Sequence, residues 1–363
     1  MSDVEANALR LNQMISGAWI TQGIYVAAEL GLADLLAGGP RTAAELARQA
    51  GAHEGALYRL LRALASVGIF AEDDQRRFTL TPLAQRLRSD APASQRWFAI
   101  MMGAEFYQSW GHLAAAVRSG REVCRQTFGM PFFEYTTRHP DRGRIYDAAM
   151  NGIHDAETVP VLDAYDFSAF RTVVDVGGGN GLALAGMLRR HPGLEGIVFD
   201  LPAVAEGARA TLDRLGLAGR GRAIGGDFFT AVPAGADAYV LRHILHDWDD
   251  EQAAAILRNC RDAMAPGGRI LVIESVIPPG NAPCFGKWID LMMLIVGGRE
   301  RTEGQFRRLF AAAGLDLRRI VPTAHEVSVI EAVQPSRPSA ERGGASPAAA
   351  SLEPVSYGRQ EAE

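Results

Sequence analysis

The chain has 363 residues, 48% of them hydrophobic and 22% charged, and a formal net charge of −5. This composition is typical of a soluble globular protein, and the net negative charge excludes a general attraction to nucleic acid. The length exceeds one typical domain and predicts two folded units plus a tail.

Cysteine usage and the N-terminus indicate where the protein works. Cys124, Cys260 and Cys284 are odd in number and widely spaced, which argues against a disulfide framework and against a Cys-x-x-Cys metal site. The start of the chain lacks the basic and apolar segments of a signal peptide, and no apolar run reaches the roughly 20 residues that span a bilayer. We therefore expect a cytoplasmic protein that does not enter a membrane.

Residues 1–95 predict a mostly helical unit that ends in a winged helix. Apolar residues recur at helical spacing through the first forty positions. Thr42 and Glu45 then form a capping-box pattern that opens a short helix, and Gly51 stops this helix. A second helix and a two-stranded hairpin are expected at 55–66, 68–70 and 77–80. This outline predicts a fold and leaves the role of the unit open.

The remainder of the chain changes pattern twice. Residues 96–165 are helical and rich in aromatic residues and methionine, whereas strands and helices alternate over 166–333, which predicts a parallel sheet covered by helices on both faces. The expected strands are 172–176, 196–199, 238–241 and 269–274, and the expected helices are 182–190, 204–215 and 251–264. Residues 334–363 contain no Ile, Phe or Trp and are rich in Pro, Ser, Ala and Gly, so we expect a disordered tail.

The first expected strand breaks into a glycine-rich loop, Asp175-Val-Gly-Gly-Gly-Asn-Gly. Glycines let the backbone turn sharply and let a ligand approach without meeting a Cβ atom. Leu182 stands where the dinucleotide fingerprint G-x-G-x-x-G has its third glycine, and no P-loop lysine is present. These departures favour a cofactor without a pyrophosphate, namely S-adenosylmethionine. The structural alternative is a glycine loop that only closes a strand–helix turn.

Two acids further along occupy positions that suit a nucleoside. Asp200 ends the next strand, 25 residues after Asp175, where a carboxylate can accept both ribose hydroxyls. Gly226-Asp227-Phe228 follows a third strand and places an acid and an apolar ring where an adenine would lie. Because the strand ends of a doubly wound sheet open onto one crevice, these groups are expected to share a site with the glycine loop.

His246 follows a further apolar strand and precedes a run of carboxylates. With an ordinary pKa of about 6.5, a neutral imidazole accepts a proton near pH 7, and a phenol with a pKa of about 10 needs such help to become a nucleophile. We therefore expect His246 to be a general base, and a structural histidine near a helix start is the alternative. His243, three residues earlier, is expected only to pack against the strand.

The carboxylates beside His246 raise the possibility of a metal site. Asp249 with Gln252 instead forms a good capping pair for the next helix, and acids suit a helix N-terminus. We therefore expect no metal. A base histidine also needs an orienting acid. Glu274, which ends the next strand, and Glu300, which opens a later helix, are both expected in this role, although a helix-terminal charge is the alternative for Glu300.

Together these residues resemble the class I S-adenosylmethionine-dependent methyltransferases. More narrowly, they look like the small-molecule O-methyltransferases related to plant caffeic-acid enzymes, and like the bacterial relatives that act on aromatic natural products. The resemblance covers about residues 10–333, and its motifs are Asp-Val-Gly-Gly-Gly-Asn-Gly, Asp200-Leu-Pro, Gly-Asp227-Phe, Leu-His246-Asp-Trp and Gly-Gly-Arg-Glu300-Arg-Thr. It implies an α/β, Rossmann-like sheet of seven strands with one antiparallel, and a winged-helix dimerisation domain. It also implies a homodimer joined by the N-terminal helices, and no metal.

The same likeness assigns roles. His246 is the catalytic base, flanked by Glu274 and Glu300. Arg242 stands where many relatives have lysine, with its contact on the adenine side. The expected contacts to S-adenosylmethionine are Asp175, Gly177, Gly179, Asp200, Leu201, Gly226, Asp227, Phe228, Phe229 and Arg242.

The acceptor is expected between the helical segment 96–165 and the sheet crevice, because an apolar, aromatic lining with a few polar groups suits a flat aromatic ligand. The expected acceptor residues are Trp110, Phe133, Met150, Asn151, His154, Asp247, Trp288, Asp290 and Met293. Aromatic residues and methionines at helical spacing also occur simply as core. Asn151 and Asp290 stand out because they are polar within apolar stretches.

Three functions compete. The favoured one is methyl transfer from S-adenosylmethionine to a hydroxyl of a phenolic or polyketide-like small molecule in antibiotic or other secondary-metabolite biosynthesis. A relative that changed its reaction to hydroxylation or cyclisation would not need the base at position 246. A winged-helix DNA-binding regulator is disfavoured, because the eight arginines between Pro40 and Asp90 face six acids, which is a weak basic excess.

Overall fold

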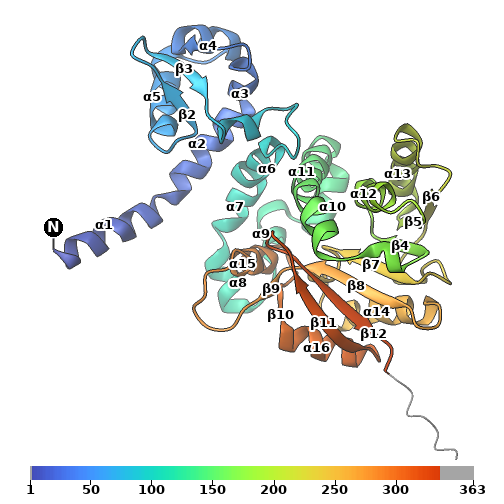
Figure 1. Ribbon diagram of the computed structural model, residues 1–363. Helices are drawn as coiled ribbons and strands as arrows, with labels where there is room; N and C mark the ends of the chain where they lie inside the picture. Colours follow the sequence, from blue (N-terminus) through green and yellow to red (C-terminus); the bar gives the residue numbers. More distant parts are fainter. Residues whose placement is uncertain (1, 336–363) are drawn as a thin grey trace, which may run out of the picture.

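The computed structural model describes residues 2–335. The predicted disordered tail, 334–363, lies outside the described residues except for its first two positions. The N-terminal helices and a small sheet lie at one side of the molecule, and a large sheet with its covering helices lies at the other (Figure 1).

The N-terminal part consists of short helices and a small sheet. Its elements are α1 (Asp3–Ile15), α2 (Gly17–Glu29), α3 (Leu32–Leu35), β1 (Arg41–Thr42), α4 (Ala43–Ala50), α5 (Glu54–Ala65), β2 (Phe70–Glu72) and β3 (Arg77–Leu80). The capping box of α4 is present, with the Glu45 carboxylate accepting from the Thr42 N–H at 2.8 Å. Gly51 ends α4 with a φ of 64°. The predicted helices and hairpin are thus confirmed, and β1 adds a third strand in the order β1-β3-β2.

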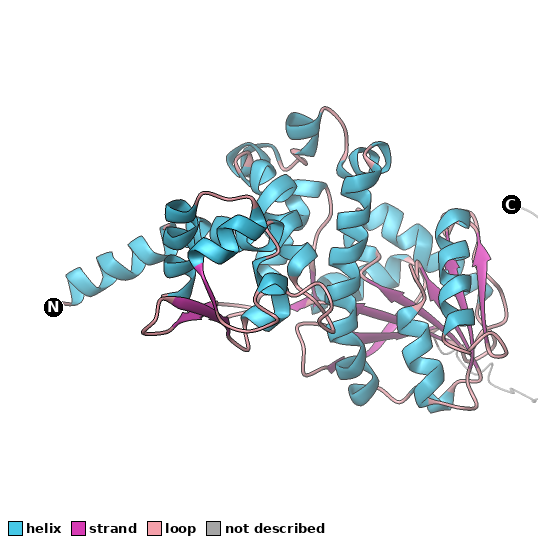
Figure 2. Cartoon of the chain, turned by 90° about the horizontal axis from the view of Figure 1, so that it is seen from above, coloured by secondary structure: helices cyan, strands magenta, loops and turns pink. Residues whose placement is uncertain are grey.

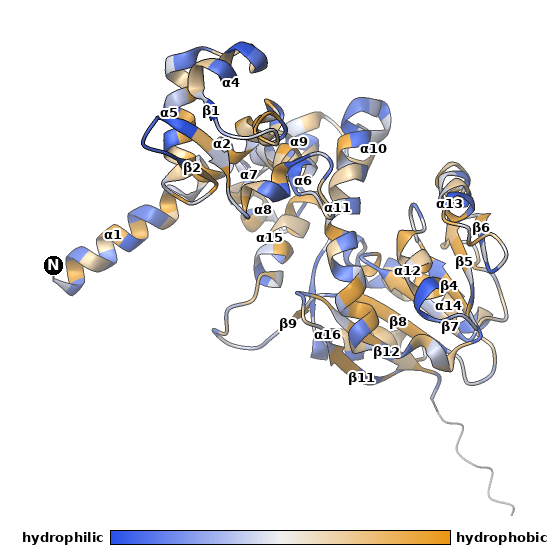
Figure 3. Cartoon of the chain, turned by 45° about the horizontal axis from the view of Figure 1, so that its top comes forward, coloured by the Kyte–Doolittle hydropathy of each residue, from blue (hydrophilic) through white to orange (hydrophobic). Residues whose placement is uncertain are grey.

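Helix α1 has no buried residue and projects away from the other elements (Figure 1). Figure 3 shows apolar and polar segments alternating along it. Leu11, Met14 and Ile15 on α1 and Trp19 on α2 are more than half exposed. A contiguous exposed apolar surface of this kind is typical of an interface with another protein.

A helical segment links this part to the large sheet. It contains η1 (Ala84–Leu87), α6 (Arg96–Met101), the π-helical turn η2 (Met102–Phe106), α7 (Tyr107–Trp110), α8 (Leu113–Ser119), α9 (Cys124–Phe128), α10 (Phe132–Arg138) and α11 (Pro140–Ala164). Gly103 in η2 lets α2 approach closely, because a Cβ atom there would run into Tyr25. Aromatic and methionine side chains of the segment form one core cluster with Ile295 and its neighbours.

The large sheet has seven strands, as expected. They are β4 (Thr172–Val176), β5 (Glu195–Asp200), β6 (Gly221–Gly225), β7 (Ala238–Arg242), β8 (Arg269–Glu274), β11 (Asp316–Pro322) and β12 (Ser328–Val333), in the spatial order β11-β12-β8-β7-β4-β5-β6. Strand β12 is antiparallel to both of its neighbours, and the pairs from β8 to β6 are all parallel. The single antiparallel strand is therefore confirmed.

Helices cover both faces of this sheet (Figure 2). Neighbouring residues of β4 serve opposite faces: Val173 packs with α11, α12 (Leu182–Arg190) and α13 (Pro202–Arg214), whereas Val174 packs with α14 (Asp250–Ala263) and α16 (Glu303–Ala312). Both side chains are fully buried, which is typical of parallel strands covered on two sides. The remaining elements are η3 (Phe167–Ala169), η4 (Leu245–Asp247), β9 (Val276–Ile277), α15 (Gly286–Val296) and β10 (Arg301–Thr302).

The strand order reverses between β4 and β7, so their carboxyl ends form the switch point at which doubly wound sheets bind ligands. The glycine loop comes directly after β4, and His246 comes shortly after β7. None of the described helices combines the length and the apolar character that a membrane span requires.

Candidate active site

The glycine loop after β4 is built on left-handed backbone. Gly177, Gly179 and Gly181 have φ angles of 68°, 57° and 76°. A Cβ atom on Gly177 would run into Ile244, whereas one on Gly179 would meet nothing within 4 Å. The loop thus packs against the β7 side at Gly177 and presents open backbone at Gly179, which suits the close approach of a ligand.

Asp200 links the end of β5 to this loop. Its Oδ2 accepts from the Gly179 N–H at 2.9 Å and its Oδ1 from the Leu201 N–H at 2.7 Å. Burial raises the pKa of Asp200, and these two backbone bonds oppose the rise. Each carboxylate oxygen has a second lone pair, so the group retains the capacity to accept two hydroxyls, as the ribose of S-adenosylmethionine requires.

The turn after β6 supplies aromatic rings. Asp227 Oδ1 accepts from the Phe229 N–H at 2.8 Å, which fixes the turn. The rings of Phe228 and Phe229 lie 5.0 Å apart, and Phe229 meets Trp248 edge-on at 4.7 Å. A hollow of about 320 Å³ opens beside Gly226 and Asp227. An acid and rings at this strand end fit an adenosine.

Arg242 ends β7 and binds α11. Its guanidinium donates to the His154 carbonyl and to Thr158 Oγ1 on α11, each at 3.1 Å. It also lies near Asp175, whose pKa is raised to about 6 mainly by burial, with the Arg242 charge opposing the rise. Residues of α11 thus supply acceptors for this buried cation, and the contact of Arg242 with the cofactor stays a prediction.

His246 lies within a group of carboxylates. Its Nδ1 is 2.7 Å from Glu300 Oε1, and its Nε2 is 3.7 Å from Asp247 Oδ1. Glu274 accepts from the His246 backbone N–H at 3.1 Å. The two predicted orienting acids thus have different partners: Glu300 holds the ring and Glu274 holds the main chain. Glu300 is only 3% exposed and precedes β10, so it is not a helix-terminal charge.

The loop that carries His246 is held by a buried arginine that sequence reasoning did not single out. Arg301 is completely buried and donates to the carbonyls of Leu245 at 2.8 Å and Trp248 at 2.9 Å. Its Nε also donates to Asp250 Oδ1 at 3.0 Å. These bonds bracket position 246 on both sides. Arg301 is the second arginine of the Gly-Gly-Arg-Glu-Arg-Thr motif, which was the available sequence signal.

The charges around His246 change its acidity. Burial alone would lower its pKa, but Asp247, Glu300 and Glu274 outweigh burial and raise the pKa of His246 to about 10. Burial in turn raises the pKa of Asp247 and of Glu274. The imidazole therefore holds a proton more strongly than an unperturbed histidine does.

The structure brings several expected acceptor residues together. Trp110 and Met150 belong to the aromatic cluster, and Asn151 accepts from Asn180 of the glycine loop at 2.5 Å. Asp290 accepts from the Glu300 N–H at 2.9 Å, so it supports the base rather than standing free. Met293 is buried beside Gly298, where a Cβ atom would run into both the Met293 side chain and the His246 carbonyl.

Two expected acceptor residues are partly exposed to solvent. Phe133 is 44% exposed, although its ring packs edge-on against Tyr146 at 5.9 Å. Trp288 is 63% exposed at the start of α15 and does not belong to the aromatic cluster. Sequence reasoning missed Tyr146, which is close enough to Asp247 for that charge to help burial in raising the tyrosine pKa. Its spacing of four from Met150 was the available signal.

His243 is not simply strand packing, so that expectation is wrong. It comes directly after β7 in the left-handed region, with a φ of 54°. Its Nε2 lies 2.8 Å from Glu157 Oε2, and its ring stacks on that of His154 with centroids 4.9 Å apart.

The run of carboxylates after His246 has a structural use. Asp249 Oδ1 accepts from the Gln252 N–H at 2.8 Å, which confirms the predicted cap of α14. Within residues 2–335, no group of three or more His, Cys, Asp and Glu side chains has the geometry to hold a metal ion.

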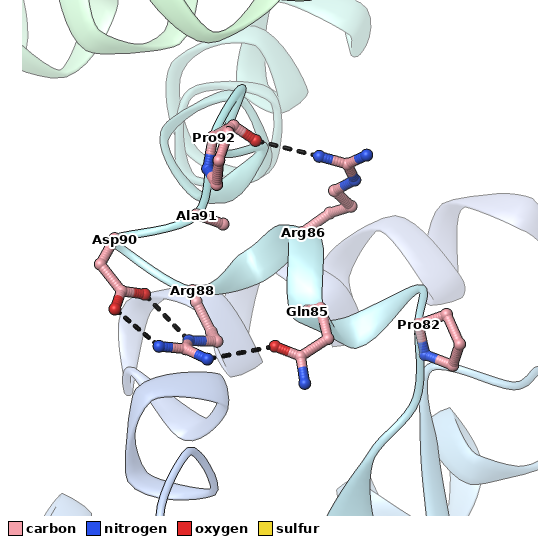
Figure 4. A pocket seen from close by; sticks show the side chains of 7 residues that line it. All are labelled: Pro82, Gln85, Arg86, Arg88, Asp90, Ala91 and Pro92. Atoms are coloured by element: carbon pink, nitrogen blue, oxygen red, sulfur yellow. Dashed lines mark hydrogen bonds and ion pairs between the residues drawn. The ribbon is translucent and has the colours of Figure 1, made fainter.

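A surface hollow of about 460 Å³ lies apart from this site, between Pro82 and Pro92 (Figure 4). Its charged side chains are already paired: Arg88 binds Asp90 and Gln85, and Arg86 donates to the Pro92 carbonyl. These bonds stabilise a surface loop and leave no charge for a ligand.

Replacing Asp247 tests the charge balance at His246. Because Asp247→Asn removes a neighbouring anion that favours the imidazolium, the pKa of His246 should fall by about one to three units. The shift is measured by NMR titration of the imidazole nitrogens. Asp249→Asn is the matched control, since asparagine is an equally good helix cap. Equal His246 titration in the two variants would contradict the assignment of Asp247.

Comparison with known proteins gives the family. Residues 110–316 match the O-methyltransferase domain, and residues 12–90 match the O-methyltransferase dimerisation domain. Phenazine O-methyltransferase PhzM of Lysobacter antibioticus is 46% identical over 89% of this chain and 95% of its own length. O-demethylpuromycin-O-methyltransferase of Streptomyces alboniger is 40% identical, over 89% and 88%.

Solved structures agree with these relatives. The structure of the mitomycin 7-O-methyltransferase MmcR has a TM-score of 0.84 and 38% identity, and the match covers 91% of this chain and 98% of that one. CalO1, a methyltransferase in calicheamicin biosynthesis solved with S-adenosylhomocysteine, has a TM-score of 0.81 and 38% identity, over 92% and 99%. The chain therefore belongs to the S-adenosylmethionine-dependent O-methyltransferases, and its dimerisation domain identifies it as a homodimeric enzyme of that family.

Proposed function

We propose that this enzyme methylates a hydroxyl of an aromatic small molecule, phenolic or polyketide-like, in the biosynthesis of an antibiotic or another secondary metabolite. The observation that carries the proposal is the 2.7 Å contact between His246 Nδ1 and Glu300, which leaves Nε2 to take the acceptor proton. The names of the phenazine, O-demethylpuromycin and mitomycin methyltransferases among the relatives support this acceptor class.

His246 acts as the general base, with Glu300 fixing its ring and Glu274 fixing its backbone. His246 accepts the acceptor proton as the neutral imidazole, and the neighbouring carboxylates, which raise the pKa of His246, stabilise the imidazolium that results. S-adenosylmethionine, when bound, supplies an electrophilic methyl group on a sulfonium. Holding the acceptor oxygen in line contributes up to roughly 7–11 kcal/mol, in addition to the base.

The cofactor is held by the glycine loop and by the ends of β5 and β6. Gly179 leaves room for the ligand, and Gly177 lets the loop pack against Ile244. Asp200 accepts the ribose hydroxyls, and the turn from Gly226 to Phe229 lies against the adenine. Leu201 comes directly after Asp200 and is 58% exposed, so its side chain can cover the adenine of the cofactor. Asp175 is buried against Gly178 of the loop. The Arg242 side chain binds α11 through the His154 carbonyl and Thr158.

The acceptor lies between α11, α15 and the loop after β7. The residues proposed to line it are Trp110, Phe133, Met150, Asn151, His154, Asp247, Trp288, Asp290 and Met293. In this arrangement residues 96–165 line the acceptor, residues 166–333 hold the cofactor and residues 1–95 dimerise. A cytoplasmic location is part of the proposal, and the unpaired Cys124, Cys260 and Cys284 fit a reducing compartment.

Removing the base tests the function directly. His246→Ala should reduce kcat for a phenolic acceptor by about 10²–10⁴-fold, because general-base help contributes this much. The affinity for S-adenosylhomocysteine, measured by calorimetry, should stay nearly unchanged. His139→Ala, which removes an exposed imidazole between α10 and α11, is the control. A nearly normal kcat in His246→Ala would mean that the acceptor ionises without help.

Asp200 can be tested by binding alone. Asp200→Ala removes the acceptor of both ribose hydroxyls and of the Gly179 N–H, so S-adenosylhomocysteine should bind at least tenfold more weakly. Isothermal calorimetry measures this, with Asp213→Ala on α13 as the control. Unchanged affinity would show that the ribose lies away from β5.

The exposed apolar surface of α1 and α2 is the proposed contact between the two copies. Met14→Glu combined with Trp19→Glu should convert the dimer to a monomer, because two charges would be buried without partners. Light scattering after size exclusion reports the mass, and Val117→Glu, at a residue that is 63% exposed on α8, is the control. A dimer that persists in the double variant would place the interface elsewhere.

A further inference from the structure

Two histidines, not one, stand at the end of β7, and each has its own buried carboxylate. His246 Nδ1 lies 2.7 Å from Glu300, and His243 Nε2 lies 2.8 Å from Glu157. The two ring centroids are 5.1 Å apart. Glu300 and Glu157 are each only 3% exposed. Deprotonation of the acceptor by His246 needs just one of these pairs, so the second pair has no role in that step.

The backbone of His243, which pairs with Glu157, has an unfavourable left-handed conformation. A φ of 54° is uncommon for a residue with a Cβ atom, and such conformations persist where the surroundings over-determine them, often at functional sites. The turn carries the His243 side chain to Glu157 on α11. Burial opposes ionisation of Glu157, but the nearby His243 and Arg242 charges lower its pKa, so the carboxylate is charged and fixes the ring firmly.

The pairing decides which nitrogens are left for a ligand. With Nε2 on Glu157, His243 keeps Nδ1, just as His246 keeps Nε2. Both side chains retain some exposure, 15% for His243 and 12% for His246. His154 stacks flat on His243 with an interplanar angle of 3°. The ring of His243 therefore lies next to those of both His154 and His246, the proposed base.

We propose that His243 binds a second polar group of the acceptor, on the ring position next to the hydroxyl that His246 deprotonates. A hydroxyl suits His243 Nδ1 in either protonation state, because it can both donate and accept a hydrogen bond. The preferred acceptor is then an aromatic ring with two adjacent hydroxyls, rather than a simple phenol. This inference rests on the proposed function, since it refines what the same site accepts.

A matched pair of probes tests the inference. In the S-adenosylhomocysteine complex, the wild-type protein should bind 2,3-dihydroxynaphthalene about tenfold more tightly than 2-naphthol, as one added hydrogen bond allows. His243→Asn should abolish this preference, because asparagine tolerates the left-handed backbone but lacks the ring. His139→Asn, at an exposed imidazole that packs against Tyr135, should keep the preference. Calorimetry measures each dissociation constant.

Equal binding of the two probes by the wild-type protein, or no binding of either, overturns the proposal, as does a preference that persists in a folded His243→Asn. If that variant does not fold, Glu157→Gln serves instead, since a loosened His243 ring should also lose the preference. These measurements need no methyl transfer. A failure here is therefore distinct from failure of the proposed function, which would appear as no methylated product from any aromatic acceptor.

Discussion

The contact between His246 and the buried Glu300 is the interaction on which the site depends. A protonated imidazole in this environment would be strongly destabilised without an anion, because burying an unpaired charge is costly. Glu300 supplies that anion at 2.7 Å from Nδ1 and leaves Nε2 as the nitrogen that we propose for the acceptor proton. The surrounding bonds serve to keep Glu300 in place, including the one that its own N–H donates to Asp290.

Hydrogen bonds to main-chain atoms hold the segment that carries Glu300 against the loop that carries His246. The Arg299 N–H donates to the His246 carbonyl at 2.7 Å, and Arg301 holds the carbonyls on either side of the histidine. The segment that carries Glu300 thus binds the loop that carries His246 through a main-chain bond from Arg299 and side-chain bonds from Arg301. A loop alone would leave the base mobile, whereas a position held from both sides limits the motion that would weaken proton transfer.

The sequence predicts the skeleton of this arrangement well, for a physical reason. Buried parallel strands are runs of apolar residues, and the loops at the carboxyl ends of these strands all lie at one edge of the sheet. The loop at Gly177, the acid at Asp200 and the base at His246 could therefore be assigned to one edge without coordinates. The capping patterns at Thr42 and Asp249 are equally local, because a helix start depends on residues within one turn.

The sequence does not predict which partners the side chains of the site bind, because this depends on the direction in which each side chain points in the folded protein. Glu274 and Glu300 are both acids near the base, and only the folded geometry shows that one binds backbone and the other the ring. Arg242 ends a strand, and only the packing of α11 shows that its guanidinium binds the His154 carbonyl and Thr158. The left-handed turn at His243 has no glycine to signal it. Tyr146 and Glu157 lie on a long helix whose inward face is fixed by tertiary contacts, not by its own pattern.

The central claim is that the imidazole of His246 receives the proton of the acceptor hydroxyl. A crystal structure with S-adenosylhomocysteine and a phenolic acceptor tests this most directly. The account predicts the acceptor oxygen within about 3 Å of His246 Nε2 while Nδ1 stays on Glu300. An acceptor oxygen bound away from that nitrogen, with the ring facing elsewhere, would contradict it.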